Sequence, residues 1–135
     1  MRHAFQPLPG ARGRARPVVD LVVEGLELAP QAFLIDTGAT GVRIGRHVAE
    51  LTGIEPDRRA QETIVVGGMR TTGWSATVEL ELRAGRDSHV WTATAFFCDP
   101  WPWAFALLGL TGLDPFVLTI DSYEEWSELQ PRGKQ

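Results

Sequence analysis

The chain has 135 residues, of which 44% are hydrophobic and 22% charged, and its formal net charge is −4. This length suits one domain with a modest core, and the hydrophobic content is that of a globular protein and not of a disordered one. No apolar run approaches the ~18 residues of a membrane helix, and the N-terminus lacks the apolar core of a signal peptide. We therefore expect a cytoplasmic protein without a membrane partner.

Cysteine and histidine, the usual zinc ligands, are few in this chain and far apart. Cys98 is the single cysteine, which excludes an intramolecular disulfide and a cysteine metal cluster. His3, His47 and His89 have no ligand spacing, so zinc is not supported. Cys98 ends an apolar run, which is typical of core packing and not of a nucleophile. We expect neither a metal nor another cofactor.

Residues 1–16 are predicted to form a flexible basic arm. Prolines and glycines there break helix and strand, and the segment holds four arginines and no acid: Arg2, Arg12, Arg14 and Arg16. The arginines can contact nucleic acid or an acidic partner, or simply be solvated. The rest of the chain carries a formal charge of −8, which argues against nucleic acid as the main partner.

The first strands are expected after the arm. Residues 17–23 are nearly all apolar and mostly β-branched, as in a strand. Glu24 and Gly25 supply a turn, and the chain returns through residues 26–33. Together these segments predict an opening hairpin.

The return strand ends at a possible catalytic acid. Its apolar run stops abruptly at Asp36, Thr37, Gly38 and Ala39, so Asp36 should emerge half-buried where a short buried strand leaves the core. Gly38 permits a tight turn whose N–H groups face the Asp36 carboxyl and hold it still. The same tripeptide is also a common surface turn in which the Asp only bonds nearby N–H groups. Both interpretations stay open at this point.

The middle of the chain predicts a mobile hairpin. Residues 42–44 are extended, and residues 46–53 form a short helix closed by a glycine. Strands over 62–66 and 74–82 flank a flexible connection at 67–73, and such a hairpin can close over a cleft. Its tip holds Val66, Gly67, Gly68 and Met69. A generic surface hairpin has the same pattern, so this segment alone does not decide between the two.

A second apolar strand runs into a glycine turn near the end of the chain. A strand over 89–98 leads to a stiff loop whose Trp101 and Trp103 either line a cleft or cover one end of the fold. The second strand and turn lie about seventy residues after the first, as though one unit were used twice: Leu107, Leu108 and Gly109. Gly109 stands near the position of Asp36 in the first unit, so only one unit carries an acid. A helical turn at 110–114, a strand over 116–120 and a short amphipathic helix within 122–135 should follow.

These motifs together resemble the retropepsin-type aspartic proteases, which include retroviral proteases, the protease domain of DNA-damage-inducible proteins and bacterial relatives. The resemblance covers about residues 17–122 and rests on four blocks, at 34–40, 66–68, 106–109 and 117–121. It implies a mainly all-β fold, a small closed β-barrel with one or two short helices. It also implies that 17–122 is the protease domain and 123–135 a C-terminal tail, and that 66–69 is a flap over the substrate.

The resemblance implies an aspartic endopeptidase in which Asp36 is catalytic. This chemistry needs two carboxyls that share a proton, one acting as base on water and the other as acid on the scissile carbonyl. A chain with one such Asp must form a homodimer to cleave a peptide or protein substrate. The resemblance further implies that Thr37 joins the two turns and that Gly38 contacts substrate backbone. The alternative is a non-catalytic peptide- or protein-binding module with the same fold.

The sequence departs from the retroviral members beside the expected dimer axis. Those members often pair an arginine after the second glycine turn with an acid four residues past the catalytic Asp. Leu110 and Thr40 occupy these two positions here. Because both members of the pair are absent together, we interpret the change as a different dimer brace and not as lost activity.

Overall fold

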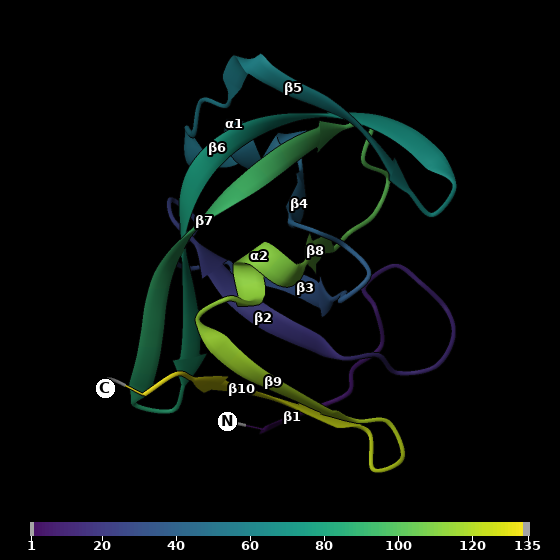
Figure 1. Ribbon diagram of the computed structural model, residues 1–135, viewed down its shortest axis with the longest axis vertical. Helices are drawn as coiled ribbons and strands as arrows, with labels where there is room; N and C mark the ends of the chain where they lie inside the picture. The colour runs from purple at the N-terminus through teal and green to yellow at the C-terminus, as the bar shows by residue number, and fades with distance from the viewer. Residues whose placement is uncertain (1, 134–135) are drawn as a thin grey trace.

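The computed structural model describes residues 2–133, which form a mainly β structure with two short helices. Figure 1 shows a barrel with a separate sheet at its lower end. The elements in chain order are β1 (Arg2–Ala4), β2 (Val18–Val23), β3 (Gln31–Ile35), β4 (Val42–Gly45), α1 (Arg46–Thr52), β5 (Asp57–Val66), β6 (Met69–Ala84), β7 (Asp87–Asp99), β8 (Ala106–Leu108), α2 (Leu110–Leu113), β9 (Phe116–Asp121) and β10 (Trp126–Pro131).

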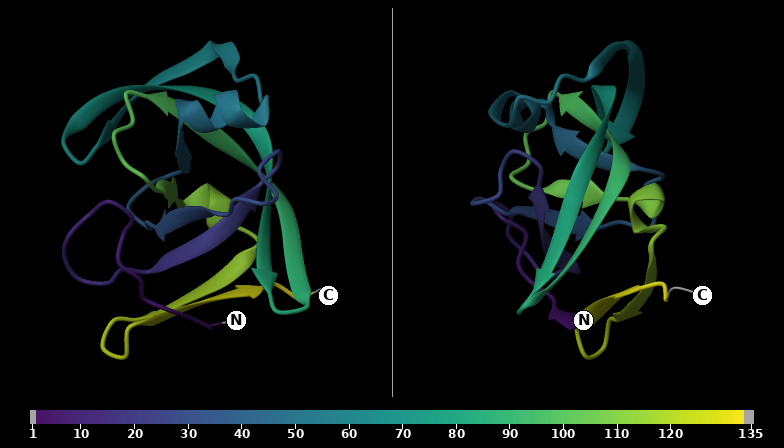
Figure 2. Two further views of the ribbon diagram at one scale, coloured as in Figure 1. Left: turned by 180° about the vertical axis from the view of Figure 1, so that it is seen from behind. Right: turned by 90° about the vertical axis from the view of Figure 1, so that its left-hand side faces the viewer.

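The larger sheet has the strand order β2-β3-β8-β4-β7-β6-β5 and closes through a further pairing of β2 with β6. Six strands therefore form the closed barrel, and β5 extends it as an outer strand on β6. The long β6–β7 hairpin runs along the whole barrel (Figure 2). Side chains of alternate strand residues fill the interior, among them the fully buried Phe33, Phe97 and Leu108. The predicted fold class, a mainly β closed barrel with short helices, is confirmed.

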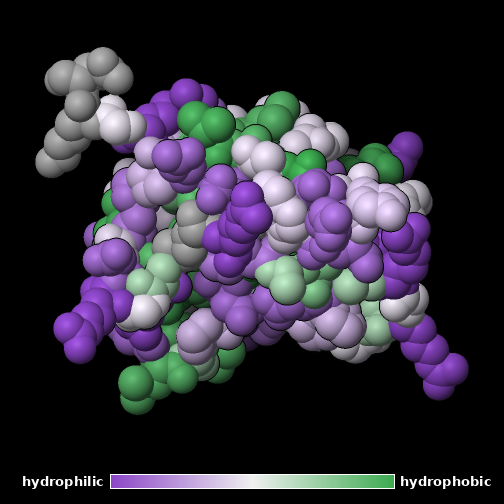
Figure 3. All heavy atoms as spheres, turned by 90° about the horizontal axis from the view of Figure 1, so that it is seen from below, coloured by the Kyte–Doolittle hydropathy of each residue, from purple (hydrophilic) through white to green (hydrophobic). Residues whose placement is uncertain are grey.

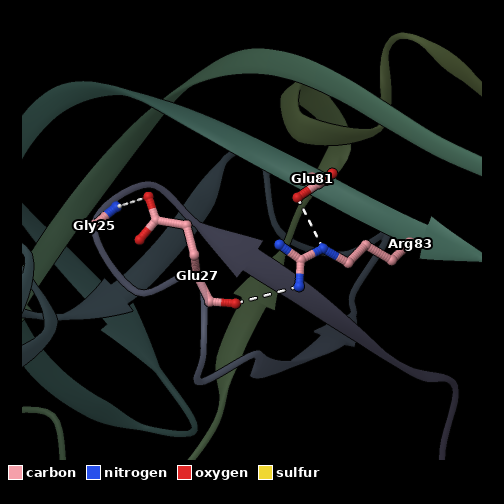
Figure 4. A network of polar contacts seen from close by, with 4 residues as sticks. All are labelled: Gly25, Glu27, Glu81 and Arg83. Atoms are coloured by element: carbon pink, nitrogen blue, oxygen red, sulfur yellow. Dashed lines mark hydrogen bonds and ion pairs between the residues drawn. The ribbon is translucent and has the colours of Figure 1, made fainter.

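Polar contacts fasten the connection between β2 and β3 to β6 where the barrel closes (Figure 4). Arg83 of β6 donates from Nη1 to the carbonyl oxygen of Glu27 at 3.2 Å and from Nε to Oε1 of Glu81 at 3.0 Å. The Glu27 carboxylate in turn accepts the N–H of Gly25 at 3.1 Å. Backbone hydrogen bonds of this kind lower the pKa of Glu27. The exposed turn after β2 is thus held against the strand that completes the barrel.

The expected hairpin in the middle of the chain is present, but its connection is shorter than predicted. β5 and β6 are joined by Gly67 and Gly68 alone, and both glycines have positive φ, of 56° and 80°. Gly73 was expected in a flexible connection and instead lies inside β6. A Cβ there would stand 2.7 Å from Cδ1 of Ile64, so this glycine makes room for packing across the hairpin.

The two short helices form as expected. The helix α1 ends at Gly53, whose φ of 77° is left-handed and whose N–H donates to the carbonyl oxygen of Ala49 at 3.0 Å. The helix α2 is the single helical turn after Gly109. Within residues 2–133, no helix is long and apolar enough to cross a membrane.

The two ends of the described chain meet in a second sheet with the order β1-β10-β9. The amphipathic helix predicted within 122–135 is wrong, because β10 occupies residues 126–131. Ser127 and Leu129 are buried while their neighbours are more exposed, which is the period of a strand, and β9 supplies its hydrogen-bond partners. The division of the chain at residues 16 and 122 stays a prediction, and each outer segment contributes a strand to this sheet.

Figure 3 shows the molecule from this lower side. Hydrophilic side chains cover most of the face, and apolar ones lie in small groups between them. At the turn between β9 and β10 the chain carries acids and the highly exposed Tyr123, and Arg14 from the basic segment reaches Glu125 at 3.9 Å. Exposed ion pairs of this length contribute little to stability.

Candidate active site

Asp36 lies where β3 leaves the barrel core, as the sequence predicted. Its N–H donates to the carbonyl oxygen of Leu108 at 3.0 Å, and its side chain is half-buried. The N–H of Gly38 donates to Oδ1 of Asp36 at 3.0 Å, and the N–H of Ala39 donates to the Asp36 carbonyl oxygen at 3.1 Å. The turn therefore fixes the direction of the carboxylate and still leaves it open to solvent.

The two glycine turns pack directly against each other. β3 and β8 run parallel, with Ile35 beside Leu108. Beyond the strands, the N–H of Leu110 donates to the carbonyl oxygen of Ala39 at 2.9 Å. A Cβ on Gly109 would stand 2.7 Å from that same oxygen, so the approach needs a residue without a side chain. The two units that the sequence suggested are thus neighbours, and the second one supports the first.

A cleft of about 390 Å³ opens in front of Asp36. β5 and the adjacent Gly67 form one wall, and the Asp36 turn, Arg43 of β4 and Leu107 of β8 form the other. Residues that line the cleft are Asp36, Gly38, Ala39, Thr40, Arg43, Glu62, Thr63, Ile64, Val65, Val66, Gly67 and Leu107. The two walls come from segments that are about twenty residues or more apart in the sequence, and the fold places them around one cleft.

Most of the predicted site residues meet in this cleft. Six of them line it directly: Asp36, Gly38, Ala39, Val66, Gly67 and Leu107. Thr37 is exposed on the same turn, and Gly68 and Met69 complete the hairpin turn beside Gly67. Leu108 is fully buried, so it and Gly109 support the turn from below instead of facing the cleft.

The aromatic loop lies behind the hairpin tip. The ring centroids of Trp101 and Trp103 are 4.8 Å apart and edge-to-face, and Nε1 of Trp101 donates to the carbonyl oxygen of Phe105 at 2.9 Å. A Cβ on Gly67 would lie 3.6 Å from the Trp103 ring, which places the hairpin tip against this loop. These aromatic rings line a separate cavity of about 210 Å³. The loop is therefore positioned to support the tip of the hairpin.

Sequence reasoning missed two charged residues in the cleft, Arg43 and Glu62. A signal for Arg43 was present, because Val42 and Ile44 are apolar and a strand turns alternate residues to opposite faces. An Arg between two core residues should therefore face away from the core. Glu62 gave no such signal, since its neighbours on β5 are mostly exposed.

Cys98, the single cysteine, is not placed to act as a nucleophile. Cys98 is buried, and burial raises the pKa of its thiol to about 11, although nearby Arg43 opposes the shift. The thiol is consequently protonated at neutral pH. Among residues 2–133, no group of three or more His, Cys, Asp or Glu side chains is placed to hold a metal ion.

Comparisons with known proteins identify the family and the fold. A family model described as "Aspartyl protease" matches residues 19–98, more than half of the chain. A retropepsin-like aspartic protease from Rickettsia conorii has a similar structure, with a TM-score of 0.56 and 15% identity over 94% of this chain and 86% of that one. The retroviral protease-like domain of Ddi1 from Leishmania major gives a TM-score of 0.58 and 14% identity, over 87% of this chain and 90% of that one. Among curated proteins, no significant match was found.

Proposed function

The chain belongs to the aspartyl protease family and has the retropepsin-like fold, and from this premise we propose that it is a homodimeric aspartic endopeptidase whose catalytic residue is Asp36. The observation that carries the proposal is the position of the Asp36 carboxylate. It stands in the wall of a cleft, oriented by the Gly38 N–H, opposite a two-stranded hairpin. An extended peptide bound between these walls would have its backbone beside the acid.

The reaction needs a second carboxyl that one subunit does not offer from the neighbouring turn. Gly109 occupies the corresponding place in the second unit, and its close contacts leave no room for a side chain. A second copy related by a two-fold axis would supply its own Asp36. One carboxylate then removes a proton from water as the water attacks the scissile carbonyl carbon, and the protonated partner acid donates to the carbonyl oxygen.

The surface around the Asp36 turn suits such a pairing. Leu110 is 50% exposed and directly follows Gly109, beside the turn that holds the acid. Thr37 and Thr40 are exposed on that turn. Burying Leu110 against a second copy would add hydrophobic stabilisation at the axis, where retroviral members use an ion pair. This supports the different dimer brace that the sequence suggested.

Replacing Asp36 by Asn tests the proposal. We expect Asp36→Asn to lower peptide cleavage by about 10²-fold to 10⁴-fold or more, because the amide cannot act as general base. Cleavage of a peptide library between pH 4 and 7 measures the loss, and sedimentation should show a dimer for both proteins. Circular dichroism and urea unfolding establish that the variant is folded.

Glu62→Gln is the matched control, since Glu62 is the other carboxylate among the residues that line the cleft. It should retain cleavage if the acid pair consists of two copies of Asp36. Full residual cleavage by purified, folded Asp36→Asn would overturn the assignment, and loss of activity in Glu62→Gln alone would point to Glu62 instead. A wild-type monomer at micromolar concentration that binds peptides without cleaving them would favour the binding module instead.

A further inference from the structure

Arg43 projects into the cleft that contains Asp36. It lies on β4 between Val42 and Ile44, which are both buried, so its side chain turns away from the barrel core. It is half-buried and lines both the 390 Å³ cleft and an adjoining cavity of about 530 Å³. A cation therefore stands at the junction of two spaces beside the proposed catalytic acid.

Packing, and not an ion pair, holds the guanidinium of Arg43 in place. Its Cζ lies 5.1 Å from the centroid of the Phe96 ring. Its Nη1 would be 3.3 Å from a Cβ at position 41, so Gly41 leaves the space that this group occupies. Among the residues that the structure describes, no carboxylate is in ion-pair contact with Arg43. Its guanidinium makes no hydrogen bond to a described residue, and Arg43 lines both cavities.

A guanidinium with free donors in a partly desolvated cleft recognises carboxylates. Its planar fork forms two parallel hydrogen bonds with one carboxylate, and such charge-assisted bonds are stronger than neutral ones. Glu62 lines the same two cavities without an ion pair to Arg43, and Asp36 and Asp114 each line one of them. Arg43 is therefore the cation among these acids, and recognition of a carboxylate rests on its fork of hydrogen-bond donors and not on the net charge of the cleft. A guanidinium of this kind can distinguish an acidic side chain from its neutral amide.

We propose that Arg43 makes the cleft selective for peptides that carry Asp or Glu close to the scissile bond. This inference rests on the proposed function, because it assigns the substrate class of that same cleft. In a two-fold dimer, one Arg43 lies on each side of the paired acids. Selectivity is therefore expected at two positions placed symmetrically about the cleaved bond.

Paired peptides that differ only by Glu or Gln at one position test this proposal. At pH 6 the Glu side chain is ionised, so the ratio of kcat/KM for the two peptides reports recognition of the charge. We expect wild type to prefer the Glu peptide by about tenfold or more at the two symmetric positions, as charge-assisted hydrogen bonds predict. Added salt should reduce the ratio.

Three variants locate the effect. Arg43→Gln should bring the ratio close to one, and Arg43→Lys, which keeps the charge and loses the fork, should give an intermediate value. Arg86→Gln removes the same charge from the exposed turn between β6 and β7, and should keep the wild-type ratio. If Arg43→Gln does not fold, Arg43→Lys carries the test, and its ratio of kcat/KM for the Glu and Gln peptides must be lower than that of wild type.

Equal cleavage of Glu and Gln peptides by wild type at every position would overturn the inference, and so would an equal drop in the ratio in Arg86→Gln. If wild type cleaves no peptide, the proposed function fails by itself. Binding of the same fluorescent peptides to Asp36→Asn then decides the inference. Tighter binding of the Glu peptide that disappears in Asp36→Asn/Arg43→Gln supports it, and equal binding refutes it.

Discussion

Replacing Gly109 by alanine tests whether close contact between the two glycine turns holds Asp36 in position. The new Cβ would stand 2.7 Å from the carbonyl oxygen of Ala39 and closer still to that of Gly41. Both contacts are backbone atoms, so a side-chain rotation cannot relieve them. The Asp36 turn must move away, and the 2.9 Å hydrogen bond from the Leu110 N–H to Ala39 weakens or breaks.

The size of the effect follows from two terms. Overpacking of a tight site typically costs about 1–3 kcal/mol, and one hydrogen bond contributes about 1 kcal/mol. We therefore expect Gly109→Ala to lower the free energy of unfolding by about 2–4 kcal/mol, measured by urea denaturation. Peptide cleavage should fall as well, because the displaced turn carries the Asp36 carboxylate. Both proteins are compared at one concentration, since the stability of the proposed dimer would depend on concentration.

Gly133→Ala is the matched control. A Cβ there meets no atom within 4 Å, so its effect should stay within about 0.5 kcal/mol. The reasoning is refuted if Gly109→Ala unfolds within about 0.5 kcal/mol of wild type with an unchanged m-value. That result would mean that the second turn tolerates a side chain and does not position the first.

Two further predictions concern the core. Leu129 is fully buried on β10, so Leu129→Ala should destabilise the protein by about 2–5 kcal/mol in urea unfolding. Leu28 is 99% exposed, so the control Leu28→Ala should change stability little. Similar values for both variants would argue against β10 as part of the core. Burial raises the pKa of the Cys98 thiol to about 11, above the value of about 8.5 in an unfolded chain. The protonated thiol therefore contributes fully to folding stability below about pH 8.5, and this contribution is lost as the pH rises toward 11. Wild type should therefore lose more stability than Cys98→Ala between pH 7 and 10, and equal losses would contradict this.

Local patterns were sufficient for the strand and turn that carry Asp36. A short apolar run that stops at an acid and a glycine has few conformations available, and two hydrogen bonds within the turn are local, from the N–H groups of Gly38 and Ala39 to Asp36. The helix closed by Gly53 is predictable for the same reason. In contrast, Gly73 was misread because its role depends on Ile64 and Phe96, which approach it from other strands.

The tail shows the same limit. Tyr123, Trp126 and Leu129 are three residues apart, as on one face of a helix. The strand buries Ser127 and Leu129 instead, and because Ser127 is polar the hydropathy of the sequence does not show this alternation. Pairing with β9 and β1 decided between the two, because the β9 edge offers backbone partners that a helix would leave unpaired. That contact joins segments separated in sequence, and no local pattern reports it.

By itself, the amino-acid sequence determined the two apolar strands with their glycine turns and the acid at the end of the first strand, and it suggested that aspartic chemistry needs a second copy. Only the tertiary structure decided what faces that acid. The pairing of β5 with β6 brings β5 to the cleft at the Asp36 turn, and the pairing of β4 places Arg43 in the lining of the same cleft. Strand pairing sets which alternate side chains point inward and which residues distant in sequence become neighbours.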